Sequence, residues 1–415
     1  MIKKIIIIFL NIFICINFKT VLTYANSTNH ILPNNWYRED VANLKKEKVT
    51  SITIENADIN KTKLKTYWEI DKKGLFAYVD DTDVFIVYPE GDMLFTDTDA
   101  NRTFSFFTLK QFDDYETGDD NEIIYDVIPK SKEYDDYNKN SVYISDLEAI
   151  YNLDFLNVSR TRNFDGFFMG LSKITNIDLS NFQTKSATSF TQMFKGCENL
   201  KEIDLEFFDT KNVLDMSMMF EDCKSLKSID TKNFKTDDLI DMIRMFKGCE
   251  SLKYININHF DTSNVKNINS IFMDCKNIEN IYIDKIDTKK LSNVESMFKN
   301  CSMIKNINID NLNLSGITEC SFMFFNCNSL ESINLSNLNL IGKTHCEYML
   351  SDCLNLKKIY ISKYIAEKID RTRLTGEWKN IKTTIVYNFN DIPLKKFPIA
   401  GTYINTKFLE GGFNG

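Results

Sequence analysis

Several residue types are scarce in this 415-residue chain, and each scarcity argues against a class of protein. Only three histidines occur, His30, His259 and His345, so the usual neutral-pH proton carrier and metal ligand is nearly missing. The chain has 50 lysines and arginines and 58 aspartates and glutamates, which gives a formal net charge of −8. That balance argues against a nucleic-acid-binding protein, which needs a basic surface. Five prolines with 43% hydrophobic and 13% aromatic residues exclude a disordered chain.

The N-terminus carries the one long apolar run, Ile5–Phe18, and no second one follows. Two lysines precede the run, and a cleavage site with a small residue, Ala25, follows it. This pattern predicts a secretory signal peptide over residues 1–25. The run is shorter than the ~18 residues of a membrane-spanning helix. Lys19 would suit an uncleaved anchor, and lipidation of Cys15 is a weaker alternative. We expect a secreted or cell-surface protein that meets a membrane only through export or anchoring.

A 26-residue period organises half of the chain. The pair Met-Phe recurs at 26-residue steps without insertion, with conservative replacements in some copies, and a degenerate first copy begins at Phe167. Eight copies therefore run over residues 167–364, and we number positions in each copy from its Met, as in Met193. Position 11 is isoleucine in every copy: Ile177, Ile203, Ile229, Ile255, Ile281, Ile307, Ile333 and Ile359.

The pattern inside one repeat indicates two kinds of local structure. Apolar positions 11 and 13 alternate with polar positions 10, 12 and 14, which is the periodicity of a strand with one buried face. Positions 21, 24, 27 and 28 are apolar at spacings of three and four, which favours a helical or 3₁₀ turn. One repeat cannot bury its own apolar edge, so the copies should stack into one elongated core.

The repeat string closely resembles that of the BspA-like leucine-rich repeat surface proteins. It reads Met-Phe-x-x-Cys-x-x-Leu-x-x-Ile-x-Leu-x-x-Phe-Asp-Thr-x-x-Val-x-x-Met, as in Met193 to Met216. The resemblance implies an α/β solenoid, a leucine-rich-repeat-like right-handed stack of eight repeats. It also implies a surface protein that attaches to host molecules and has no catalytic residues.

Position 18 of the repeats is a column of small polar residues. At position 16, Phe or Leu stands where leucine-rich repeats usually have an Asn that bonds buried backbone groups. A different group must therefore bond the backbone there. We expect the threonines at position 18 to do so as a ladder: Thr184, Thr210, Thr236, Thr262 and Thr288.

Nine cysteines lie in the repeats, seven at position 5 and two, Cys320 and Cys346, at position 24. All nine are at core positions, where free cysteine behaves as a small hydrophobic residue. We therefore favour free buried thiols over disulfide bonds, although stacked neighbours fall within disulfide range. A zinc site is disfavoured because no Cys-x-x-Cys occurs.

The flanking segments lack the period. Residues 26–166 contain strand-like runs at 49–54, 75–79, 84–88 and 103–107, and they read as a β-rich N-terminal cap domain. Residues 365–415 form a C-terminal cap and tail with a closing strand at 383–389. The acidic loop 113–120 does not fit a calcium-binding EF-hand, so no metal or other cofactor is expected.

Exposed strand positions 10, 12 and 14 offer a face for a partner, either a protein or a glycan but not a nucleic acid. Tyrosine suits such contacts because its ring combines apolar area with a polar tip. We expect a non-enzymatic protein that binds through this face, with a self-associating structural protein, or less readily an enzyme in residues 26–166, as alternatives. The candidate partner-binding residues are Tyr254, Tyr282, Tyr360, Asp204 and Glu202.

Overall fold

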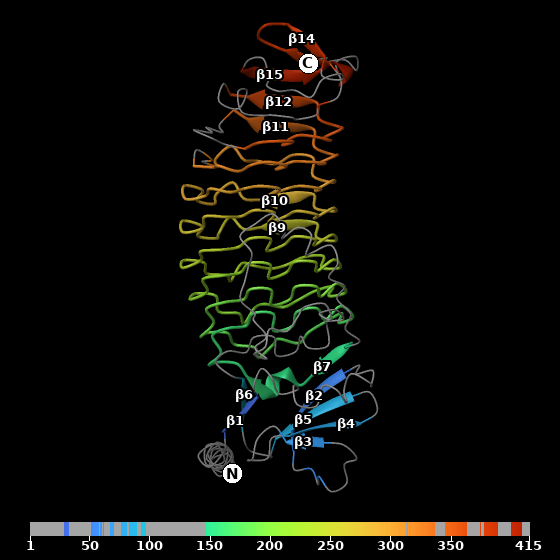
Figure 1. Ribbon diagram of the computed structural model, residues 1–415, viewed down its shortest axis with the longest axis vertical. Helices are drawn as coiled ribbons and strands as arrows, with labels where there is room; N and C mark the ends of the chain where they lie inside the picture. Colours follow the sequence, from blue (N-terminus) through green and yellow to red (C-terminus); the bar gives the residue numbers. More distant parts are fainter. Residues whose placement is uncertain are drawn as a thin grey trace, which may run out of the picture.

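The repeats stack along one long axis, between strands of the N-terminal segment at one end and of the C-terminal segment at the other (Figure 1). The signal peptide predicted at 1–25, the strand expected at 103–107 and the acidic loop at 113–120 lie outside the described residues. The computed structural model describes residues 29–32, 51–57, 59, 61, 67–69, 76–80, 83–88, 93–96, 147–312, 314, 316–336, 345–362, 374, 377–388 and 400–408.

Two sheets precede the repeats, with strand orders β3-β4-β5-β2-β7 and β1-β6-β8. The strands expected at 49–54, 75–79 and 84–88 are confirmed as β2, β4 and β5. Strands β7 and β8 directly precede the first repeat and pair in parallel with β2 and β6, so they tie the N-terminal segment to the stack. The elements are β1 (Asn29–Leu32), β2 (Ser51–Asn56), β3 (Tyr67–Glu69), β4 (Phe76–Asp80), β5 (Asp83–Tyr88), β6 (Met93–Thr96), β7 (Ala149–Tyr151), the 3₁₀ helix η3 (Leu153–Phe155) and β8 (Leu156–Asn157).

Successive repeats lie parallel with an offset of 26 residues. Strand β9 (Tyr254–Asn256) pairs with β10 (Asn280–Tyr282), and Ile255 lies opposite Ile281. Strand β11 (Ser332–Leu335) pairs in the same way with β12 (Lys358–Ile361). Single parallel bridges link position 23 of neighbouring repeats, for example Ser189 with Asp215. The period of the sequence is thus the period of the stack.

Positions 24–26 and 1–5 of each repeat, here called the turn segment, differ from the expected helical turn. Hydrogen bonds from residue i+3 to residue i do occur, as from the Met193 N–H to the Phe190 carbonyl. However, positions 26 and 4 have left-handed backbone, as in Gln192 (φ 59°) and Gly196 (φ 74°). A left-handed residue every few positions prevents a continuous right-handed helix. The described turn segments are therefore successive turns whose alternate N–H groups bond the next repeat, as Phe194 does to Met219 at 2.9 Å.

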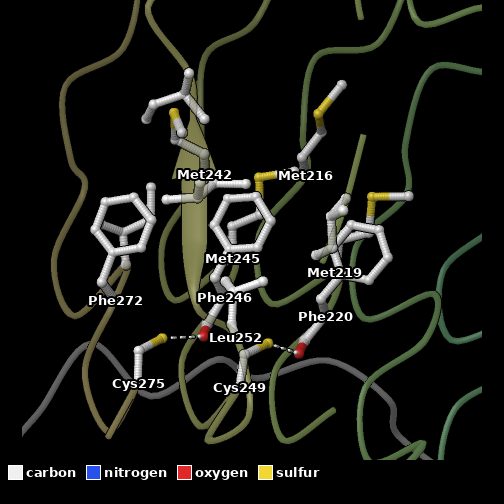
Figure 2. Close-up of a cluster of buried hydrophobic side chains, with 14 of the residues drawn as sticks. Met216, Met219, Phe220, Met242, Met245, Phe246, Cys249, Leu252, Phe272 and Cys275 are labelled. Atoms are coloured by element: carbon white, nitrogen blue, oxygen red, sulfur yellow. Dashed lines mark hydrogen bonds between the residues drawn. The ribbon is translucent and has the colours of Figure 1, made fainter. Parts of the chain in front are cut away.

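One continuous hydrophobic core runs from Ile52 to Tyr403. The position-11 isoleucines lie in it, with only Ile203 partly exposed. At position 2 the phenylalanines stack face to face in one column, with ring centroids 5.3–5.9 Å apart in successive repeats (Figure 2). The column is Phe168, Phe194, Phe220, Phe246, Phe272, Phe298 and Phe324.

The five threonines at position 18 are buried, and Thr184, Thr210, Thr236 and Thr262 bond backbone groups of the neighbouring repeat, as expected. Thr210 donates its hydroxyl to the Lys235 carbonyl at 2.8 Å and accepts the Lys235 N–H at 2.7 Å. Thr262 donates to the Asp287 carbonyl at 2.7 Å. In the sixth repeat, Leu314 occupies this position and is buried without a hydroxyl.

The seven cysteines at position 5 are free and buried. Each thiol donates to the carbonyl of a phenylalanine in the preceding repeat at 3.1–3.2 Å, and Figure 2 shows Cys249 and Cys275 doing so. Burial raises the pKa of Cys197 to about 12. The prediction of free thiols is wrong for the position-24 pair, because a disulfide joins Cys320 to Cys346. Their Cα atoms, in adjacent repeats, are 4.8 Å apart, within disulfide range.

The C-terminal segment adds three strands to the last repeats, in the order β11-β12-β15-β13-β14. Strand β15 (Gly401–Asn405) pairs antiparallel with β12, and is followed by the 3₁₀ helix η4 (Thr406–Phe408). The closing strand expected at 383–389 is β14 (Val386–Asn388). Trp378 lies in β13 (Glu377–Asn380) and is buried, so its indole helps to cover the end of the core.

Candidate partner-binding face

Tyr254 and Tyr282 lie on the outer face of the paired strands β9 and β10. Tyr254 is opposite Asn280 and Tyr282 is opposite Asn256, so the two tyrosines are diagonal neighbours. A strand spacing of ~4.8 Å and two residues of ~3.3 Å each place their Cα atoms about 8 Å apart. Both side chains are exposed, at 53% and 48%, while the intervening isoleucines are buried. The structure thus brings together two of the five candidate partner-binding residues.

Position 12 has a structural role that explains its polar residues. In six repeats an Asp or Asn there accepts the backbone N–H of the residue two places later and so ends the strand with a turn. Asp204 is one of these, accepting the Glu206 N–H at 2.9 Å. Tyr282 and Tyr360 replace this residue and cannot make the same bond. The tyrosines therefore sit where the repeat otherwise uses a turn-forming side chain.

Glu202 and Asp204 are exposed but belong to a repeat two steps before Tyr254. At ~4.8 Å per repeat they lie about 10 Å away along the stack. Asp204, but not Glu202, lines a hollow that also includes Asp230 and Lys232. The Lys232 ammonium, 2.5 Å from the Asp230 carboxylate, donates a hydrogen bond that lowers the pKa of Asp230. The hollow therefore contains an acidic group already matched by a cation.

Tyr360 is separated from the other tyrosines. It lies three repeats beyond Tyr282, about 14 Å along the stack, and β15 pairs with its strand, placing Thr402 opposite. Its ring is half-buried and the Lys358 ammonium lies 4.6 Å from the ring centroid. The five candidate residues therefore form one tyrosine pair and two outlying groups rather than a single compact site.

A column of lysines at position 9 was missed in the sequence. Lys201, Lys227 and Lys253 are exposed and follow one another in consecutive repeats, the last directly before Tyr254. Backbone hydrogen bonds join them in order, from the Lys227 N–H to the Lys201 carbonyl and from the Lys253 N–H to the Lys227 carbonyl. Reading position 9 down the aligned repeats would have revealed the column.

A second charged group lies on the turn segment and is closed to solvent. The Glu221 carboxylate is fully buried between Lys195 at 3.0 Å and Lys247 at 3.1 Å. Burial opposes ionisation of Glu221, but the two ammonium groups outweigh it and lower its pKa. For the adjacent Asp222, burial and then the charge of Glu221 raise the pKa to about 6. This arrangement fixes the register of three repeats rather than presenting a binding surface.

Among the residues that the structure describes, there is no helix with the length and apolarity needed to cross a membrane.

Comparison with known families places the repeats in a family of unknown function. A family described as "Mycoplasma protein of unknown function, DUF285" matches residues 139–255 and 240–364, which together cover more than half of the chain. Searches of the curated proteins and of the solved structures give no match. The matched residues contain all four strands β9 to β12 and the exposed tyrosines.

Proposed function

Since the chain belongs to the family described as Mycoplasma protein of unknown function, DUF285, we propose that it is an exported, non-enzymatic surface protein. It binds a protein or glycan partner through the exposed face of its stacked strands. The predicted signal peptide at 1–25 supports export. The finer assignment to the BspA-like leucine-rich repeat proteins, with their right-handed solenoid, rests on the repeat string and is compatible with parallel stacking at 26-residue steps.

The exposed pair Tyr254 and Tyr282 carries the proposal. Partner-binding surfaces are enriched in tyrosine, because its rigid ring buries a large area at low entropic cost. At position 12, Tyr282 occupies the place of an Asp or Asn that forms a turn in six repeats. A residue that gives up a local hydrogen bond and exposes an aromatic ring to water has no local structural benefit. A partner that covers the ring would supply one.

Residues 26–415 probed against protein and glycan arrays should identify the partner, and Tyr254→Ala with Tyr282→Ala should test the face. We expect the double variant to weaken binding at least about 10-fold, the loss typical of removing central interface aromatics. The matched control is Leu214→Ala with Ile240→Ala, because these side chains are also exposed but lie at position 22 of their repeats. Equal losses in both variants, or none in either, would exclude the tyrosine pair from the interface.

The alternative of a self-associating structural protein is favoured by one observation at the C-terminal end. Strand β14 is an edge of the five-stranded sheet, and Ile381, Ile385 and Val386 are exposed around it. An edge strand with exposed apolar side chains can pair with another chain. Sedimentation velocity at increasing concentration tests this: association that Val386→Lys abolishes would support it, and a monomer throughout would exclude it.

A further inference from the structure

Three lysines without ion pairs form a straight line beside the tyrosine pair. Lys201, Lys227 and Lys253 occupy position 9 of three consecutive repeats, and their backbones are hydrogen-bonded in sequence. Repeats stack ~4.8 Å apart, so the line spans about 10 Å along the axis of the molecule. In the part of the chain that the structure describes, none of the three ammonium groups has a carboxylate partner within ion-pair distance.

Other charged columns of the same stack are matched by opposite charges. At position 6, Lys224 pairs with Glu198 at 2.7 Å and Lys276 pairs with Glu250 at 2.8 Å. Further along position 9 itself, Lys357 pairs with Glu331 at 2.8 Å. Like charges on directly neighbouring strands are unfavourable. The lysine line is thus a stretch where stacking places like charges together and, among the described residues, none of the three lysines has an ion-pair partner.

The surroundings of the line leave it accessible from the strand face. Glu279 follows Lys253 in the same column, and Glu202 follows Lys201 in the chain; both are exposed. Neither forms an ion pair with the lysines. Tyr254 directly follows Lys253, and Tyr282 lies diagonal to Tyr254 on the next strand. The line of exposed cationic side chains therefore ends at the residue directly before Tyr254, next to two exposed rings.

We propose that the lysine line and the tyrosine pair together bind an anionic polysaccharide; this rests on the proposed partner-binding function and names the chemistry of the partner. A linear glycan carrying sulfate or carboxylate groups along its length can place several anions along the line. The sugar rings present apolar faces that can pack on tyrosine. An acidic polypeptide would supply the charges as well, but a segment rich in Asp and Glu offers few flat apolar faces that could pack on the two rings. The observations therefore favour the glycan.

Direct binding of residues 26–415 to heparin, followed by calorimetry at several salt concentrations, tests the proposal. The variant Lys201→Gln, Lys227→Gln and Lys253→Gln should weaken heparin binding at least about 10-fold and flatten its salt dependence, because fewer counterions are released. The control variant Lys211→Gln, Lys266→Gln and Lys285→Gln removes the same net charge from exposed sites outside the line. It should leave both quantities near those of the unchanged protein.

The remaining outcomes separate this proposal from the broader one. Failure to bind heparin, or equal losses in the two lysine variants, would overturn it. Poly-glutamate that binds as tightly and with the same sensitivity to the lysine variant would make the partner an acidic polypeptide and refute the glycan. If Tyr254→Ala with Tyr282→Ala abolishes binding to an array partner while the lysine variant does not, the proposed function stands and the anionic ligand is wrong. Thermal unfolding of each variant verifies that it is folded.

Discussion

The turn segment and the strand face of the same repeats are built in different ways. The turn segment contains the repeated columns, including the stacked phenylalanines and the buried thiols that bond phenylalanine carbonyls. Its alternate N–H groups bond the next repeat. The strand face has strands of only three or four residues, and its outward side chains change from repeat to repeat.

The difference assigns stability to the turn segment and recognition to the strand face. A column of identical side chains extends the same packing from one repeat to the next, so each turn segment supports its neighbours. The outward strand positions touch no core, and apart from position 12, where an Asp or Asn forms a turn in six repeats, they can vary without loss of stacking. Exposed groups that depart from the common pattern there, such as Tyr254, therefore point to binding. Variants in the two regions test whether stability and recognition are divided in this way.

The largest effect is expected in the phenylalanine column. Phe246→Ala would remove a fully buried ring that stacks on Phe220 at 5.9 Å and on Phe272 at 5.8 Å. The free energy of unfolding should fall by about 3–5 kcal/mol. Denaturant titration measures it, with Ile240→Ala, an exposed residue of the preceding repeat, as the control. A loss below about 1 kcal/mol would contradict the assignment of stability to this column.

A slightly smaller loss is expected when the Cys320–Cys346 disulfide is removed. The bond closes a 26-residue loop, for which the loss of chain entropy in the unfolded state stabilises the fold by about 3 kcal/mol. Cys320→Ala with Cys346→Ala should lower the melting temperature, as should a reductant acting on the unchanged protein.

The reductant should have no effect on that double variant. In residues 26–415, thiol titration after denaturation should find seven groups without reduction and nine with it. Nine thiols before reduction would show that the bond is absent in the protein.

A gain in stability is expected when Asp222 is replaced by asparagine. Its pKa is about 6, against an ordinary 3.8, so the folded state binds this proton more tightly than the unfolded state. Stability therefore falls as the pH rises from about 4 to 6 and remains reduced above that range. At about 1.4 kcal/mol per pKa unit, Asp222→Asn should stabilise the protein by up to about 3 kcal/mol at pH 7.

The same position in other repeats provides the reason and the control for this variant. Asn300 and Asn326 occupy position 4 with left-handed backbone like that of Asp222, so asparagine fits there. Asp352→Asn, at the same position but exposed, should change stability by less than about 0.5 kcal/mol at pH 7. If unfolding of the Asp222 variant and of the unchanged protein depends on pH in the same way, the pKa of the Asp222 carboxyl is not raised in the folded state.

Sequence patterns predicted the parts of the fold that depend on apolar periodicity. The burial of the position-11 isoleucines and the locations of β2, β4 and β5 follow from spacing alone. The left-handed backbone of Gln192, Met218 and Arg244 could not be predicted, since such residues rarely adopt it. In the candidate site, exposure of Tyr254 and Tyr282 followed from strand alternation, whereas the turn-forming role of Asp204 required atomic positions.

The smallest expected effect distinguishes most directly between a structural and a recognition role for the strand face. Tyr282→Asn would restore the side chain that forms a turn at position 12 in six other repeats. A regained hydrogen bond is worth about 0.5–1.5 kcal/mol, and the lost ring is half exposed, so unfolding should require slightly more free energy than before. Partner binding should weaken in the same variant. If Tyr282→Asn instead destabilises the fold by more than about 1 kcal/mol, the ring belongs to the packing, and a partner is not needed to explain it.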